Sequence, residues 1–312
     1  CGAAGEIGFY FHAELPNKRS AFTVSGGAEA STYHDDYMDI PGADPNASLY
    51  DYAVREAELI FKHFGIHPSF VMLTLGNELS RVPAMSERVE RFKNRDPRPR
   101  YSQGSNVDHW DPIYAEDDDF WVTKKTAKTL PVRGAFFEGD FAGGGYIYSQ
   151  LPSTLTDYSS SIKDSPVPVI GHEIAEFEVT PDFSEIPKYT GVVKARNLEI
   201  FQQRLKDAKM LDLSHDFMRA SGALAAICQR EDIEAALRTP GFGGFHWLDI
   251  QDFPGQGTAL VGMLNDFMEN KGITTPEAWR QFCSETVPLL LMRKYTWTTE
   301  DTFSAQVKIA HY

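Results

Sequence analysis

The sequence predicts an α/β fold: an incomplete (β/α)8 TIM barrel followed by the first strands of a β-sandwich. Short apolar strands recur near residues 7, 70, 100, 132, 167 and 242, and most are followed by a helix. Such βα repetition is typical of a parallel sheet. Because a barrel needs eight units, we expect strands three to eight here, with the first two upstream of this chain. A doubly wound sheet is the alternative, but no Gly-rich strand-to-helix turn for a nucleotide is present.

Turn signals separate the elements predicted in the first half of the chain. Ser48 caps a helix that runs to about Phe64, and Gly65 and Pro68 end it. The following run, Phe70–Leu75, is continuously apolar, as in a strand buried on both faces. The other elements expected here are a helix tail at 1–6, a strand at 7–12, a long loop at 17–48, a helix at 85–92, a strand at 100–103, an aromatic and acidic loop at 107–128 and a strand at 132–137.

The second half continues the same alternation and then changes. Helices are expected at 153–162, 185–208, 216–237 and 275–283, and strands at 167–173 and 241–249. The small apolar run Ala220–Cys228 indicates a buried helix. From Val287 onward, apolar runs and the period-two alternation of Phe303–Ile309 predict β-sandwich strands. We therefore expect a barrel domain at 1–285 and the start of a sandwich domain at 286–312.

Composition excludes several classes of partner. The chain has 312 residues, with 44 acidic against 30 basic side chains and a net charge of −14. This charge argues against nucleic acid and anionic membranes as partners. No apolar run reaches membrane-spanning length, and the three cysteines show no metal-ligand spacing. The aromatic content of 12% suits the binding of sugar rings as well as a core.

Two glutamates end apolar strands and are the candidate catalytic residues. Asn77 and Glu78 follow one strand, and His172 and Glu173 end another, so that the glutamates are 95 residues apart. That spacing equals about three βα units of roughly thirty residues, which places strands four and seven on opposite walls of a barrel. Two carboxylates at such a rim can flank one glycosidic bond. The alternative is a loop carboxylate beside an Asn77 that caps the next helix.

Three motifs carry a resemblance to a known family. His67-Pro-Ser with Leu75-Gly-Asn-Glu78 resembles the acid/base strand of glycoside hydrolase family 2, the β-galactosidase and β-glucuronidase family. Pro168–Glu173 resembles its nucleophile strand, and Gly243–Trp247 resembles its eighth strand. The resemblance implies a retaining exo-glycosidase that removes a terminal sugar from an oligo- or polysaccharide, with Glu78 as acid/base and Glu173 as nucleophile. It implies no redox cofactor, nucleotide or metal, and it favours a periplasmic or secreted protein.

Other residues are expected to contact substrate, each with a structural alternative. Asn77 offers an amide donor for a sugar 2-hydroxyl, and Trp247 offers a flat floor for a pyranose ring. His12 matches the end of strand three, where the family places substrate contacts, or it is a solvated loop histidine. His172 touches substrate or packs behind the nucleophile. Asp249 orients Trp247, binds a hydroxyl or makes a structural hydrogen bond.

Some features leave alternatives open. Glu176 and Glu178 are rival nucleophiles on the same stretch as Glu173. Ile174 stands where the family usually has an aromatic residue, and the segment 251–257 differs from the galactosidase version, so the sugar is left open. Asn106, Glu138 and Asp140 end further strands and are additional candidates for sugar contact. The rival functions are a catalytically inactive glycan-binding barrel, a glycosidase of the same clan with another sugar specificity, and an inverting hydrolase with more widely spaced carboxylates.

Overall fold

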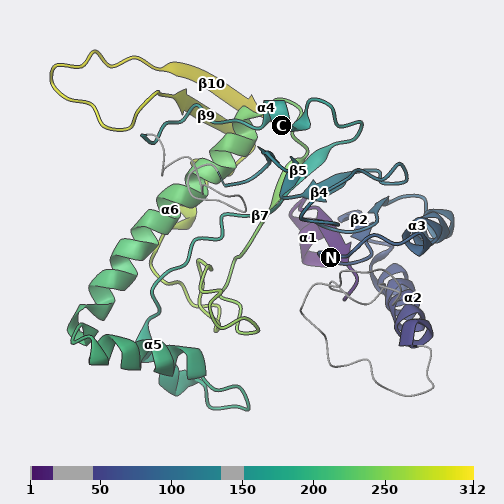
Figure 1. The fold of residues 1–312 in the computed structure, drawn as a ribbon, viewed down its shortest axis with the longest axis horizontal. Coiled ribbons are helices and arrows are strands. Elements are labelled where there is room, and N and C mark those ends of the chain that lie inside the picture. The colour runs from purple at the N-terminus through teal and green to yellow at the C-terminus, as the bar shows by residue number, and fades with distance from the viewer. Residues whose placement is uncertain (1, 17–44, 135–150) are drawn as a thin grey trace. The chain divides into compact units, whose positions relative to one another are not determined.

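A computed structural model describes residues 2–16, 45–134 and 151–312 (Figure 1). The chain divides into two compact units. Unit 1 comprises Cys1–Val132 and Ser161–His172, and unit 2 comprises Arg133–Ser160 and Glu173–Tyr312. Each unit has hydrophobic clusters of its own.

Unit 1 is built on a parallel sheet. Its elements are α1 (Gly2–Glu6), β1 (Phe11–Glu14), α2 (Pro45–Phe64), β2 (Phe70–Thr74), α3 (Ala84–Arg95), β3 (Arg100–Ser102), β4 (Trp121–Thr123), β5 (Lys125–Ala127) and β6 (Leu130–Pro131). The strands β1, β2 and β3 are adjacent and parallel, with Glu14, Thr74 and Ser102 in register. The predicted parallel pairing of these three strands is confirmed, and their carboxyl ends lie at the same edge of the sheet.

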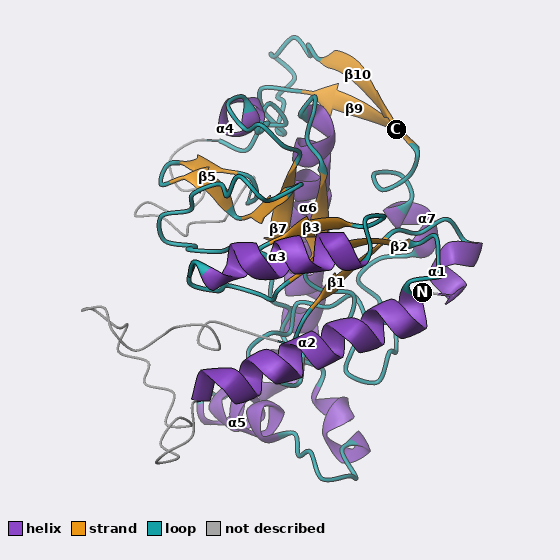
Figure 2. Ribbon diagram, turned by 90° about the vertical axis from the view of Figure 1, so that its right-hand side faces the viewer, coloured by secondary structure: helices purple, strands orange, loops and turns teal. Residues whose placement is uncertain are grey.

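The helices α2 and α3 pack against this sheet because each has one apolar face (Figure 2). In α3 the buried residues are Met85, Val89 and Phe92, and the i, i+4, i+7 spacing places them on one side. In α2, Ala57 and Phe61 are buried in the same cluster, one turn apart. Each large apolar side chain buried in this way contributes about 1.5–3 kcal/mol relative to exposure.

Two short strands of unit 1, β4 and β5, lie where the sequence predicts a loop. Trp121–Thr123 forms β4, which pairs in parallel with the first residues of β7 (Val169–Ile174), with Trp121 opposite Val169. The expectation of a loop at 107–128 is therefore wrong for this segment. Residues 130–131 form β6, which pairs antiparallel with β5. The next strand was predicted at 132–137, and residues 135–137 of it lie outside the described part of the chain. Four consecutive acidic residues at 116–119 precede β4, and this polar run obscures a strand of only three residues.

Unit 2 is organised around a long helix. Its elements are the 3₁₀ helices η2 (Phe183–Lys188) and η3 (Leu211–Leu213), α5 (Arg196–Asp207), α6 (Ser214–Arg238), β8 (Gly244–Trp247), α7 (Pro276–Trp279), β9 (Thr286–Leu291) and β10 (Gln306–His311). Helix α6 buries Gly222, Ala225 and Cys228 on one face but leaves Leu224 and Ile227 half exposed. The predicted buried stretch Ala220–Cys228 is thus covered along a single face, whereas residues 231–236, nearer the C-terminal end of α6, are all buried.

The C-terminal strands form a hairpin beside the C-terminal end of α6 (Figure 1). Strands β9 and β10 are antiparallel, with Leu290 opposite Val307.

The predicted helix at 153–162 is shorter than expected, since α4 covers only Ser159–Ile162. The preceding backbone N–H groups make tertiary contacts instead: Thr154 N donates to the carbonyl of Met292 at 2.9 Å.

Within the described residues, no helix is long and apolar enough to cross a membrane. Closure of the parallel strands into a (β/α)8 barrel, the domain boundary at residue 285 and the β-sandwich stay predictions.

Candidate active site

In unit 1, Glu78 stands just beyond the carboxyl end of β2. The backbone there continues the parallel pairing, because Glu78 N donates to the carbonyl of Ser105 at 2.8 Å and Ser105 N donates to the carbonyl of Gly76 at 2.9 Å. Glu78 has a φ of +53°, in the left-handed region. For a residue with a Cβ this conformation costs about 1–2 kcal/mol, so the surrounding hydrogen bonds hold Glu78 in a strained position.

The Glu78 side chain is buried beside a cation. Its exposed fraction is 7%, and its Oε1 lies 3.6 Å from Nζ of Lys124, which is itself 15% exposed. A pair of charges this far from water interacts more strongly than a surface pair. No pattern in the sequence singles out Lys124, because it follows β4, which lies in a segment predicted to be a loop.

Asn77 does not cap the following helix. The N-cap residue of α3 is Pro83, so the helix-capping alternative for Asn77 is wrong. Among the described residues, the Oδ1 atom of Asn77 is buried and has no hydrogen-bond partner. This open atom is an acceptor, whereas the predicted contact to a sugar 2-hydroxyl uses the amide donor, so that role of Asn77 stays a prediction.

Two further polar side chains lie at this edge of the sheet. His12 lies within β1, half-buried, with Nε2 at 3.1 Å from Oγ1 of Thr74, so it is not a solvated loop histidine. Its ring edge contacts Phe120, with 5.4 Å between the ring centroids. Ser105 donates its hydroxyl to Glu14, a carboxylate that the sequence analysis did not select. The sequence holds one indication for Glu14, which lies two residues after His12 and therefore on the same face of the strand.

Asn106 is fully buried at the same edge. Its backbone N donates to the carbonyl of Val122 at 2.8 Å, and its Oδ1 accepts from the backbone N of Lys124 at 3.3 Å. Because that N–H fixes which side of the amide is oxygen, Nδ2 is a buried donor, and it has no partner among the described residues. Asn106 therefore stays a candidate for sugar contact, whereas Glu138 and Asp140 lie outside the described residues.

In unit 2, Glu173 lies at the end of β7. It has a φ of +48°, and Ala175, two residues later, has a φ of +68°. The Glu173 side chain is 20% exposed, while Ile174 between these two residues is buried in an apolar cluster. The apolar side chain anchors the segment, and the carboxylate keeps access to solvent.

A buried arginine binds the start of this segment. Arg133, 2% exposed, donates from Nη1 to the backbone carbonyl of Glu173, and the same nitrogen lies 4.0 Å from the Glu173 carboxylate. Nη1 also lies 2.9 Å from Oε2 of Glu176, so that carboxylate is held in an ion pair. Glu178 is exposed. Glu173 and Glu176 thus share one arginine, and the choice of Glu173 as nucleophile over Glu176 and Glu178 stays a prediction.

The remaining candidates for substrate contact are His172, Trp247 and Asp249. In unit 1, His172 is 2% exposed, which favours packing over a substrate contact. In unit 2, Trp247 packs on Trp279, with ring centroids 4.5 Å apart and an interplanar angle of 34°, so one ring face is covered. Asp249 accepts a hydrogen bond from the backbone N of Ile250 at 2.5 Å, which is the structural contact among the predicted alternatives.

Comparisons with known proteins give little additional information. No protein-family model matches the chain, and no curated protein sequence matches it. A crystal structure of a protein described as a putative β-galactosidase from Bacteroides fragilis is similar over 83% of this chain, with 14% sequence identity and a TM-score of 0.38. The chain spans 35% of that protein.

Proposed function

We propose that this chain carries the catalytic strands of a retaining, exo-acting glycoside hydrolase with a (β/α)8 barrel, similar to β-galactosidases and β-glucuronidases. One observation carries the proposal. Seven non-glycine residues in the described part of the chain have a positive φ, and two of them are Glu78 and Glu173. Strained backbone clusters at functional sites, and here it coincides with both glutamates selected from the sequence.

The two glutamates have complementary roles in this mechanism. Glu173 attacks the anomeric carbon and forms a covalent glycosyl–enzyme, while Glu78 gives its proton to the departing glycosidic oxygen. Glu78 then takes a proton from water, and the resulting attack releases the sugar with retained configuration. A retaining enzyme requires its two carboxyl groups roughly 5 Å apart, whereas an inverting enzyme requires roughly 6.5–9.5 Å.

Each of the two glutamates has a cation beside it, which stabilises negative charge on a nucleophile and on an acid that has given up its proton. Lys124 lies 3.6 Å from Glu78, and Arg133 lies 4.0 Å from Glu173, so each carboxylate has one cation at ion-pair distance. Neither cation is exposed: the Arg133 side chain is 2% exposed and that of Lys124 15%. Charges fixed in partly desolvated surroundings act on developing charge more strongly than charges in water.

Covalent labelling tests the proposal. The reagents are dinitrophenyl 2-deoxy-2-fluoroglycosides of the galacto, gluco and manno series, followed by peptide mass spectrometry of the full chain. We expect the label on Glu173. Glu78→Gln should slow hydrolysis of substrates with poor leaving groups far more than that of dinitrophenyl glycosides, because general acid assistance is worth about 10²–10⁴-fold.

A matched control variant and the outcome of labelling distinguish the proposal from the alternative nucleophiles and functions. Glu178→Gln makes the same chemical change as Glu78→Gln, but on an exposed side chain five residues after Glu173. It should leave the labelling of Glu173 intact. A label on Glu176 or Glu178 would move the nucleophile. Hydrolysis with inverted configuration and no label would indicate an inverting enzyme, and sugar binding without turnover would indicate a glycan-binding barrel.

A further inference from the structure

Three polar contacts hold the backbone at the C-terminal end of β7. Arg133 donates to the carbonyl of Glu173, and the backbone N of Leu248 donates to the carbonyl of Ile174 at 3.1 Å. The backbone N of Ala175 donates to Oδ2 of Asp232 at 2.9 Å. Glu173 and Ala175 both have positive φ, so this short segment stores strain at two of its three residues. Such strain persists only where surrounding contacts over-determine the conformation.

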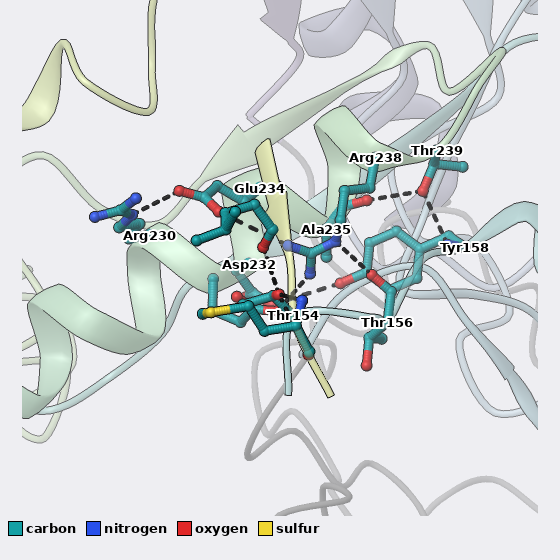
Figure 3. A network of polar contacts seen from close by, with 12 residues as sticks. Thr154, Thr156, Tyr158, Arg230, Asp232, Glu234, Ala235, Arg238 and Thr239 are labelled. Atoms are coloured by element: carbon teal, nitrogen blue, oxygen red, sulfur yellow. Dashed lines mark hydrogen bonds and ion pairs between the residues drawn. The ribbon is translucent and has the colours of Figure 1, made fainter. Parts of the chain in front are cut away.

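Asp232 comes from a buried part of unit 2. It lies on helix α6, 57 residues after Ala175 in sequence, and is 1% exposed. The hydroxyl of Tyr158 lies 3.5 Å from its other oxygen, Oδ1, and the backbone N of Tyr158 donates to Oγ1 of Thr239 at 2.9 Å (Figure 3). Thr239 in turn donates its hydroxyl to the carbonyl of Ala235 at 2.8 Å. Of these contacts, the one from Tyr158 reaches the Asp232 carboxylate, and no described hydrogen bond joins Thr239 to Asp232 or Ala175.

Packing reinforces this connection. Ile174, Ala175 and Ile233 belong to one buried cluster, so the residue next to Asp232 on α6 contacts the same apolar group as the strand end. Apolar contacts are not directional and do not select a backbone conformation. The hydrogen bond from Ala175 is directional and, because its acceptor is a carboxylate, stronger than a neutral one. It specifies the orientation of the peptide that precedes Ala175.

We propose that Asp232 is a positioning residue that holds Glu173 in its left-handed conformation through the Ala175 amide. The inference rests on the proposed function, in which Glu173 is the nucleophile. Asp232 does not touch the reacting atoms in this scheme. It fixes the peptide group between Ile174 and Ala175. It thereby sets the direction in which the Glu173 side chain leaves the backbone. A misplacement of about 1 Å at a reacting group can cost on the order of 100-fold in rate.

Three variants of the full chain test the inference. Asp232→Leu keeps the number and branching of the side-chain heavy atoms but removes the acceptor, whereas Asp232→Asn keeps an oxygen that can accept from Ala175. Thr239→Val removes a polar contact elsewhere in the same network, where no described hydrogen bond reaches residues 173–175. Each is compared with the wild type for the rate of labelling by the dinitrophenyl 2-deoxy-2-fluoroglycosides, for kcat and KM, for thermal stability and for hydrogen exchange at the Ala175 amide.

The expected pattern separates positioning from stability. Asp232→Leu should lower kcat and the labelling rate about 100-fold with KM within about threefold, and it should speed exchange at Ala175. Asp232→Asn should stay within about fivefold of the wild type, and Thr239→Val should lose stability but retain kcat. If Asp232→Leu retains kcat, or loses no more of it than Thr239→Val, the positioning role is refuted while labelled Glu173 still supports the proposed function. If wild-type Glu173 takes no label, the proposed function fails first, and the positioning role is refuted with it.

Discussion

Replacing Asp118 with asparagine should stabilise the protein at neutral pH. Asp118 is 6% exposed in unit 1 and accepts a hydrogen bond from the backbone N of Gln103 at 2.6 Å. Burial raises the pKa of Asp118 from 3.8 to about 6, although the Gln103 hydrogen bond acts in the opposite direction. A difference of about two pKa units corresponds to about 3 kcal/mol, because each unit is worth about 1.4 kcal/mol.

The pH dependence follows from the direction of this shift. A raised pKa means that the folded state binds the proton more tightly than the unfolded state. The stabilisation from Asp118 is therefore fully present below pH 3.8 and is lost as the pH rises through about 6. Asparagine cannot ionise but keeps an oxygen for the Gln103 amide. The variant should thus match the wild type near pH 4 and exceed it by up to about 3 kcal/mol at pH 7–8.

Urea unfolding of both proteins between pH 4 and pH 8, followed by tryptophan fluorescence, measures this difference. Glu116→Gln is the matched control, because it makes the same change in charge on an exposed side chain of the same loop. Its effect on the free energy of unfolding should be small and should not grow between pH 4 and pH 7. A pH-independent difference for Asp118→Asn, or a less stable variant at pH 7, would refute the reasoning from burial.

Two further predictions concern unit 2. Gly262→Ala should strongly lower the midpoint of thermal unfolding, because a Cβ at Gly262 would lie 2.2 Å from a main-chain carbon. Gly191→Ala is the control and should leave that midpoint unchanged, because a Cβ at Gly191 would have no atom within 4 Å. Arg238→Met should cost about 3–5 kcal/mol in urea unfolding, because Arg238 and its partner Glu231 are both 1% exposed and the carboxylate would lose its cation. Arg280→Met removes an exposed pair and should leave the unfolding midpoint unchanged; an equal loss in the two arginine variants would refute the burial argument.

The sequence by itself determined where the strands that carry the candidate site lie. The apolar run before Asn77 and the run before Glu173 each predicted a strand, and β2 and β7 occupy those positions. Local periodicity suffices for this, because a strand buried on both faces must be apolar at consecutive positions. The polar residue that ends such a run is then a candidate for chemistry without knowledge of any distant contact.

Only the tertiary structure decided what surrounds the two glutamates. Lys124 reaches Glu78 across 46 positions of sequence, and Arg133 reaches Glu173 across 40. Asp232 binds Ala175 from a helix 57 residues away. Contacts of this kind depend on how elements pack and leave no periodic trace in the chain. The strand β4 was missed for a related reason: its three residues are buried by their neighbours in the sheet, while the acidic residues before them make the local sequence resemble a loop.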